Sequence, residues 1–214
     1  MWEFIDKIVY INLDHRQDRR DIMSKFFEKG QIPLEKVIRF PAIKRSRGEV
    51  GCLESHTEVL KMAKFEQWKN VLILEDDIEW TNFEQYSKLE ELTKLPKWDV
   101  IMLMGWYYRY DFPRIFYANH TSAYLVNKSY YNTLLENRLE SLEKIKKRSG
   151  FNFSSFSFNA DVYWKKLMEK DNWYGLYPCI CRQIDGFSDV GNKVQETSKV
   201  VGIYDKKVHD KVYT

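Results

Sequence analysis

Short apolar runs alternate with amphipathic stretches along much of the chain. The apolar runs are typical of buried strands and lie at 8–11, 37–40, 71–74, 99–105 and 123–126. Helical spacing of apolar residues predicts helices at about 49–68, 84–95 and 129–147, and one carrying Ile22, Met23, Phe26 and Phe27 that stops at Gly30. We also expect a short helix starting near Asp161, an extended segment at 174–181 and a polar tail after Gly186, loose beyond about residue 190.

This alternation predicts the α/β class, with a mostly parallel sheet covered by helices on both faces. The sequence contains no repeat or linker, so we expect one domain over residues 1–214. Ligands of such sheets bind at the carboxyl ends of the strands. Two strand ends are notably polar, the loop from Asn12 and the triplet starting at Glu75.

Composition narrows the classes of function. The chain has 34 basic and 31 acidic residues, a balance that argues against nucleic acid as the main partner. Aromatic residues make up 16% of the chain, and we expect most in the core and a few along a ligand groove. Three cysteines without zinc spacing suggest a reducing compartment. With no signal-like start and no apolar run of membrane length, the expected location is cytoplasmic.

The most informative cluster is Glu75-Asp76-Asp77, directly after the apolar run 71–74. Three adjacent carboxylates are costly there unless a cation neutralises them. On an extended chain Glu75 and Asp77 point to one side and Asp76 to the other. That pair would suit Mg²⁺ or Mn²⁺, which also bind diphosphate oxygens. A solvated acidic turn is the alternative.

Two further clusters could contact a nucleotide. The loop after the first strand contains Asn12, Arg16 and Arg19, whose amide and guanidinium groups suit a ribose, a base or phosphates. An ordinary charged loop is the alternative. The stretch from Gly48 to His56 places two glycines at a helix start, where they allow close backbone approach. The apolar spacing around His56 favours a core histidine, and its neighbour Ser55 cannot face it on a helix.

Two late carboxylates could take part in catalysis. Asp161 lies near a helix start between aromatic residues and could act as a general base. Its alternative role is a favourable charge at the helix terminus. Asp189 could be a further metal or substrate contact, and a surface turn explains it equally well.

The order of these motifs resembles glycosyltransferase family 25, the lipopolysaccharide-type and procollagen-galactosyltransferase-like enzymes. The resemblance covers about Lys7 to Val190 and rests on the stretches 9–13, 48–52, 55–56, 71–77, 98–101 and 121–126, with Arg16, Arg19, Arg20, Asp161, Gln183 and 188–190. Two features depart from it: Glu54 stands before Ser55-His56, and residues 144–158 match nothing in the family pattern.

The resemblance implies a GT-A fold and inverting, Mn²⁺- or Mg²⁺-dependent transfer of galactose or glucose from a UDP-sugar. It implies Glu75 and Asp77 as metal ligands, and Asp161, or secondly Asp189, as catalytic residue. The nucleotide sugar would be held by Ile11, Asn12, Leu13, Arg16, Arg19, Glu49, Ser55, His56 and Asp76. The acceptor stays open among a glycan, a lipid-linked saccharide and hydroxylysine.

Two other functions remain possible. A catalytically inactive module of the same fold would bind nucleotide or glycan without turnover. A nucleotidyltransferase would also need paired carboxylates and a metal. The sequence lacks the glycine-rich phosphate loop of P-loop enzymes, which argues against phosphoryl transfer of that type.

Overall fold

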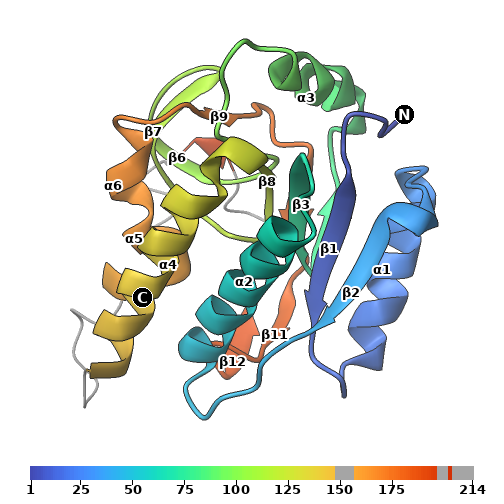
Figure 1. Cartoon of the computed structure of the whole chain (residues 1–214). Helices are drawn as coiled ribbons and strands as arrows, with labels where there is room; N and C mark the ends of the chain where they lie inside the picture. Colours follow the sequence, from blue (N-terminus) through green and yellow to red (C-terminus); the bar gives the residue numbers. More distant parts are fainter. Residues whose placement is uncertain (148–156, 197–201, 204–214) are drawn as a thin grey trace.

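The computed structural model describes residues 1–147, 157–196 and 202–203, and its centre is one large sheet (Figure 1). Within this part of the chain, nine strands form the sheet in the order β13-β6-β7-β9-β5-β8-β3-β1-β2. Their bounds are β1 Lys7–Asn12, β2 Val37–Pro41, β3 Asn70–Glu75, β5 Val100–Met102, β6 Trp106–Asp111, β7 Arg114–Asn119, β8 Ala123–Asn127, β9 Trp173–Gly175 and β13 Gly202–Ile203.

The remaining elements surround this sheet. Two small antiparallel sheets pair β4 (Ile78–Trp80) with β10 (Cys181–Gln183), and β11 (Gly186–Ser188) with β12 (Lys193–Gln195). The helices are α1 Gln17–Lys29, α2 Gly48–Phe65, α3 Tyr86–Thr93, α4 Tyr131–Lys147, α5 Ala160–Tyr163 and α6 Lys165–Met168, with 3₁₀ turns at Leu34–Lys36, Phe83–Gln85 and Lys128–Tyr130.

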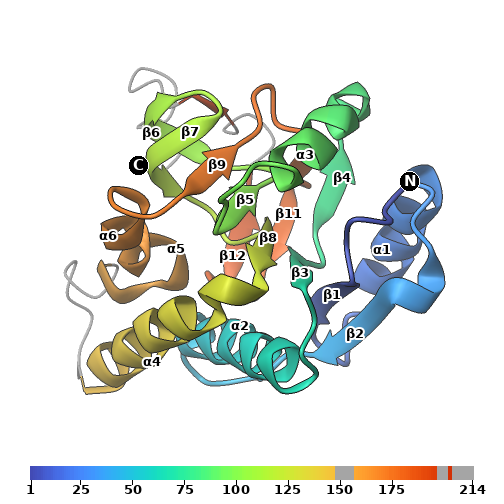
Figure 2. The ribbon, with the colours of Figure 1, turned by 45° about the horizontal axis from the view of Figure 1, so that its top comes forward.

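The sheet is mostly parallel, as predicted. The pairings give seven of the nine described strands one direction, and only β7 and β8 run the other way. The chain passes from β1 through α1 to β2, at the edge of the sheet. It then passes from β2 through α2 back across β1 to β3. Because parallel crossovers are right-handed, these two helices lie on opposite faces. Figure 2 shows α1 on one side and α2 with α4 side by side on the other.

The predicted apolar runs form the centre of the core. Strand β3 is flanked by β1 and β8, and its residues Val71, Leu72, Ile73 and Leu74 are completely buried. Burial on both faces explains why this strand has no polar alternation. The run at 99–105 is shorter as a strand, since only 100–102 pair in the sheet.

Helix α1 ends where expected, but for a different reason. The left-handed residue is Gln31 (φ 48°), and the amides of Gln31 and Ile32 donate to the carbonyls of Glu28 and Phe27. This pattern is a Schellman motif. Gly30 has φ −80°, and a Cβ there would lie 2.8 Å from the Trp80 ring. Glycine is therefore needed for the approach of Trp80 and not for the turn.

One element was not predicted, and one expectation needs correction. The hairpin of β6 and β7 does not follow from the apolar pattern, because the stretch Trp106–Asp111 has no regular alternation. The segment after Gly186 is not a loose tail as far as residue 196, because β11 and β12 pair as a hairpin. Of the unmatched region 144–158, residues 148–156 lie outside the described residues.

Candidate active site

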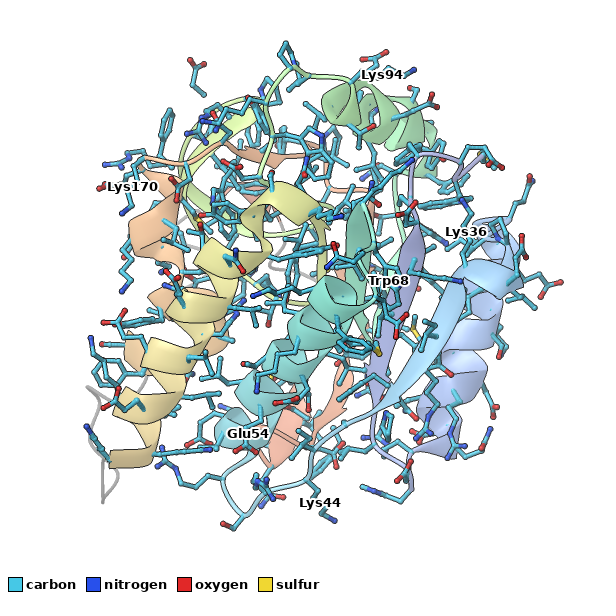
Figure 3. The ribbon with its side chains drawn as sticks, viewed as in Figure 1. Lys36, Lys44, Glu54, Trp68, Lys94 and Lys170 are labelled. Atoms are coloured by element: carbon cyan, nitrogen blue, oxygen red, sulfur yellow. The ribbon has the colours of Figure 1, made fainter. Side chains whose placement is uncertain are left out.

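A cleft of about 910 Å³ opens where β1 and β3 end. Its walls come from the first turns of α2, the β7–β8 turn, α5 and the β11–β12 hairpin. Figure 1 shows that hairpin beside the first turn of α2, and Figure 3 shows Lys44 and Glu54 at the same end of the molecule. Sequence segments far apart thus meet at the edge of the sheet predicted for ligand binding.

Most of the predicted site residues line this cleft. Those that do are Ile11, Leu13, Arg19, Glu49, Ser55, His56, Glu75, Asp76, Asp77, Asp161 and Asp189. Asn12 and Arg16 are not among the lining residues. The cleft therefore brings together the clusters that were far apart in sequence.

Both carboxylate oxygens of Glu75 already accept hydrogen bonds. Thr121 Oγ1 lies 2.9 Å and His56 Nε2 3.3 Å from Oε1, while Ser122 Oγ lies 2.8 Å from Oε2. Gln183 Nε2 lies 3.3 Å from Oε2 as well. Burial alone would raise the pKa of Glu75, but the bonds from His56, Ser122 and Thr121 outweigh it and hold the pKa at about 2. Glu75 is thus a well-compensated anion.

Asp76 and Asp77 diverge from the end of β3. Asp76 Oδ2 accepts from Asn12 Nδ2 at 2.6 Å, toward β1. Asp77 Oδ2 lies 3.0 Å from Arg19 Nη1, and Gln183 Nε2 reaches both Asp77 and Glu75 at 3.3 Å. The shared Gln183 contact puts Glu75 and Asp77 on one side, as the extended-chain argument predicts.

The carboxylates of the triplet differ in how well the fold compensates their charge. Burial raises the pKa of Asp76, against the opposing effects of Asn12 and Arg19, so this anion is incompletely compensated. A cation nearby would relieve that cost. At Glu75 a cation would have to displace existing donors. The metal pair of Glu75 and Asp77 stays a prediction, with both side chains beside Gln183 and Asp76 turned toward Asn12.

Asn12 supports the cleft from behind. It is 1% exposed, donates to Asp76 and to the Arg16 carbonyl, and accepts from Arg39 Nε at 2.9 Å. This burial leaves no room for the base or ribose contact expected from sequence. Asn12 instead fixes the orientation of Asp76.

The two arginines of the first loop differ in role. Arg16 pairs with Asp18 and Asp189, so its guanidinium is already occupied by carboxylates. Arg19 lines the cleft, pairs with Asp77 and donates to the Phe187 carbonyl. Asp189 also lies 3.7 Å from His15 Nε2. With Arg16 as its ion-pair partner, Asp189 is less suited than Asp161 to accept a proton.

The glycines at the start of α2 allow close backbone packing. A Cβ on Gly51 would lie 2.3 Å from the Ile43 carbonyl, and one on Gly48 would lie 2.7 Å from Val190 Cα. Ser55 strengthens the first of these contacts, because its Oγ donates to the Gly51 carbonyl and accepts from the Ile43 amide, both at 2.8 Å. These contacts hold the 42–45 segment and the β11–β12 hairpin against α2.

His56 is a buried histidine with two partners. Its Nδ1 lies 2.9 Å from the Tyr124 hydroxyl and its Nε2 contacts Glu75. The Cys52 thiol lies close enough to His56 and Glu75 for these three side chains to form a possible metal-binding set. Burial raises the pKa of the Cys52 thiol well above its usual value, which keeps it protonated. The set therefore resembles a hydrogen-bonded support for Glu75 more than a metal centre.

Helix α4 positions Asp161. Three of its polar side chains are almost fully buried and donate to backbone carbonyls around α5: Arg138 to Ala160, Ser141 to Phe158, and Asn137 to Tyr163. Arg138 also stacks over the Trp164 ring at 4.6 Å. Asp161, in the first turn of α5, thereby faces the cleft from a rigid support.

Several cleft residues were missed from sequence. They lie at the base of the β6–β7 hairpin, in the turn to β8 and on β10: Trp106, Tyr108, Asn119, His120, Thr121, Ser122 and Gln183. The family pattern includes Thr121, Ser122 and Gln183 but gives them no role. The other four, Trp106, Tyr108, Asn119 and His120, belong to no sequence motif. Only the pairing of β6 with β7 brings them together.

Comparisons with known proteins agree with this architecture. A model of glycosyltransferase family 25 (LPS biosynthesis protein) matches residues 39–155. A Drosophila melanogaster protein described as a glycosyltransferase 25 family member is 32% identical over 112 residues, which cover 39% of this chain. The chain spans 17% of that relative's length.

Two solved structures share the fold. A197 from STIV has a TM-score of 0.51 and 16% identity, covering 95% of this chain and 99% of that one. A glycosyltransferase involved in the glycosylation of the major capsid of PBCV-1 has a TM-score of 0.51 and 11% identity, covering 80% and 81%. At these identities they support the GT-A-type α/β fold alone. Because the family model covers more than half of the sequence, the chain belongs to glycosyltransferase family 25.

Proposed function

We propose that the chain transfers a hexose, galactose or glucose, from a UDP-sugar to an acceptor hydroxyl with inversion and with the help of Mn²⁺ or Mg²⁺. The observation that carries this proposal is the acidic triplet Glu75-Asp76-Asp77 at the end of β3, beside Arg19 in a cleft large enough for a nucleotide sugar. Hard carboxylate oxygens and a guanidinium are the groups that a metal diphosphate requires.

The donor half of the cleft lies along β1, β2 and α2. Ile11, Leu13 and Ile43 offer apolar surface for a nucleobase, and Arg19 offers a guanidinium to the diphosphate. A divalent cation held at the triplet, with Asp77 as a ligand, would neutralise the charge that grows on the departing diphosphate. Arg19, which pairs with Asp77, would act on the same charge.

Asp161 is the proposed base. Its carboxylate takes the proton of the acceptor hydroxyl while that oxygen forms a bond to the anomeric carbon. The bond from that carbon to the diphosphate oxygen breaks, and UDP leaves with the electron pair. Attack from the face opposite UDP inverts the anomeric centre. Asp161 lines the same cleft as the acidic triplet and Arg19, which fits this role.

The Asp77→Asn variant tests the metal assignment through UDP release from UDP-galactose and UDP-glucose at varied Mn²⁺. We expect a rate loss of at least about a hundredfold, because the cation would lose a charged ligand. Chelation with EDTA should reduce the wild-type rate similarly. Glu79→Gln is the control, since Glu79 pairs with Arg182 on β4 and β10.

Three outcomes would contradict the proposal. Undiminished Mn²⁺-dependent turnover in Asp77→Asn would remove the metal assignment. UDP binding without turnover on either donor would favour the inactive binding module. Release of pyrophosphate from UTP, with no release of UDP from a UDP-sugar, would favour a nucleotidyltransferase.

A further inference from the structure

We infer that the wall of the cleft formed by Trp106, Tyr108, Asn119 and His120 is a saccharide-binding subsite, so that the acceptor hydroxyl belongs to a carbohydrate. The inference rests on the proposed function and specifies its acceptor. All four residues line the cleft together with Asp161, and they come from β6, β7 and the turn to β8.

The aromatic part of this wall is held firmly. Trp106 and Tyr108 of β6 both line the cleft, and the register of β6 against β7 shifts between Tyr107 and Arg109, at Tyr108. Trp106 is only 8% exposed, so its side chain would lose little conformational entropy on binding a ligand. Lys165 Nζ lies 4.9 Å from the centre of the Tyr108 ring. Rigid aromatic rings with polar neighbours suit the mixed apolar and hydroxyl surface of a pyranose.

His120 is held in a strained conformation. Its φ is 92°, a region that non-glycine residues rarely occupy. The ring packs edge-on against Trp106 at 5.1 Å, and its Nδ1 lies 3.3 Å from Ser122 Oγ. No described residue hydrogen-bonds its Nε2. Such strain costs free energy and gathers at ligand sites. Here the strained backbone fixes the His120 imidazole, and its Nε2 is left to hydrogen-bond a hydroxyl group of the ligand.

Asn119 adds an unused amide. Its side chain has no hydrogen bond to any described residue, and its Oδ1 is buried without a donor. A buried acceptor of this kind is costly. Rotation of the amide toward the cleft would break no existing bond and would satisfy that oxygen with a sugar hydroxyl. Asn119 and His120 thus complete a set of neutral polar groups beside aromatic rings.

Part of this wall is closed to strand addition. Peptide backbones commonly bind by adding a strand to a free sheet edge. At Trp106 and Tyr107, β6 is paired on both sides, with β13 and with β7, so these two residues present no free edge. A ligand at Trp106 would therefore be recognised by side chains, as a saccharide is.

Saturation-transfer NMR with methyl β-galactoside, methyl β-glucoside and methyl α-mannoside, in the presence of UDP and Mn²⁺, tests the subsite directly. UDP release from the donor is measured in parallel with each glycoside as acceptor. We expect at least one glycoside to bind and to raise UDP release above donor hydrolysis. In Asn119→Ala and His120→Gly the KM for that glycoside should rise about threefold to tenfold each, with the donor KM unchanged.

Gln31→Gly is the matched control, because Gln31 is also left-handed but lies at the end of α1. It should leave both KM values unchanged. The inference is overturned when no glycoside gives a transfer signal, when both cleft variants keep the wild-type glycoside KM, or when only a hydroxylysine-containing collagen-like peptide stimulates UDP release. Glycoside binding without any UDP release would instead contradict the proposed function and leave the subsite standing.

Discussion

Gly30 and Gln31 divide between them two requirements that one glycine often meets at a helix end. Gly30 lets the Trp80 ring approach, and its carbonyl accepts from Trp2 Nε1 at 2.8 Å. Gln31 takes the left-handed conformation, which disfavours any side chain with a Cβ. The two positions should therefore respond in opposite ways to substitution.

Replacing Gln31 with glycine should stabilise the protein. Relief of the left-handed strain outweighs the added freedom of the unfolded chain, for a net gain of about 0.5–1 kcal/mol. Urea unfolding followed by circular dichroism measures this change. Gly30→Ala is the opposing case and should destabilise, because the new methyl group meets Trp80. A loss of stability in Gln31→Gly would refute the strain argument.

The buried His56 should make stability depend on pH. Burial lowers its pKa and Arg138 acts in the same direction, while Glu75 and Asp161 oppose them. Cys52 and Tyr124 are its other titratable neighbours. The unfolded chain then binds the proton more readily than the fold does. Stability should accordingly fall as the pH drops below about 6.5, the unfolded histidine value, with a slope of up to about 1.4 kcal/mol per pH unit.

His56→Gln measures that contribution. The variant should unfold more easily overall, but its free energy of unfolding should change less between pH 7 and pH 5.5 than that of the wild type. Denaturant titrations across this range give the comparison. Equal slopes in the two proteins would mean that the His56 pKa is the same folded and unfolded.

At the scale of elements, α4 shows how a helix distant from the cleft can control chemistry in it. Its buried Asn137, Arg138 and Ser141 satisfy three carbonyls of the segment that carries Asp161. Four-residue α5 has too few internal hydrogen bonds to be stable alone. The position of Asp161 thus depends on side chains about 20 to 24 residues earlier in the sequence.

Asp161→Asn and Ser141→Ala separate the base from its support. Asp161→Asn should lower kcat by about a hundredfold or more with little change in the donor KM. Ser141→Ala should cost about 1 kcal/mol of stability and reduce kcat only severalfold. Steady-state kinetics together with thermal unfolding distinguish the two. A normal kcat in Asp161→Asn would exclude Asp161 as the base.

The elements themselves followed largely from pattern. Strands such as β1, β3 and β8 are buried on both faces, so a continuous apolar run marks them. Strand β6 was missed because its side chains change from buried at Trp106 to exposed at Asp111, so no continuous apolar run marks it. Its identity as a strand comes from pairing with β7 and β13, which no local pattern records.

At the scale of the whole molecule, the cleft depends on contacts between distant segments. The triplet could be located from sequence because the apolar run 71–74 shows where a strand ends. Which of its carboxylates is compensated could not be predicted. Three of the four groups that contact Glu75 lie 46, 47 and 108 residues further along, at Thr121, Ser122 and Gln183. Only the folded arrangement shows that Glu75 is compensated by hydrogen bonds while burial raises the pKa of Asp76.

The β11–β12 hairpin is the part of the cleft that can be removed most cleanly. It supplies Asp189 to Arg16 and the Phe187 carbonyl to Arg19, yet it forms a separate sheet. Gly186 and Gln195 are paired across its base, so two glycines can replace residues 186–195. The shortened protein should keep its fold, while the donor KM rises at least about tenfold, a loss of about 1.4 kcal/mol.

Titration of UDP with Mn²⁺ by calorimetry and far-ultraviolet circular dichroism measures the two effects. Phe187→Ala is a milder companion, because it keeps the backbone carbonyl that Arg19 uses. Normal donor affinity after removal of the hairpin would show that the donor does not bind against it.

Strand β8 runs against β3 and β5, and this reversal has a consequence for protein design. In an all-parallel sheet every strand ends at the same edge, so only residues that follow a strand can contribute side chains there. The reversed strand begins at that edge, so the two hydroxyls just before it, on Thr121 and Ser122, reach Glu75. Transplanting the acidic triplet onto an all-parallel scaffold would leave its first carboxylate short of those donors, and the recipient would need a substitute for them.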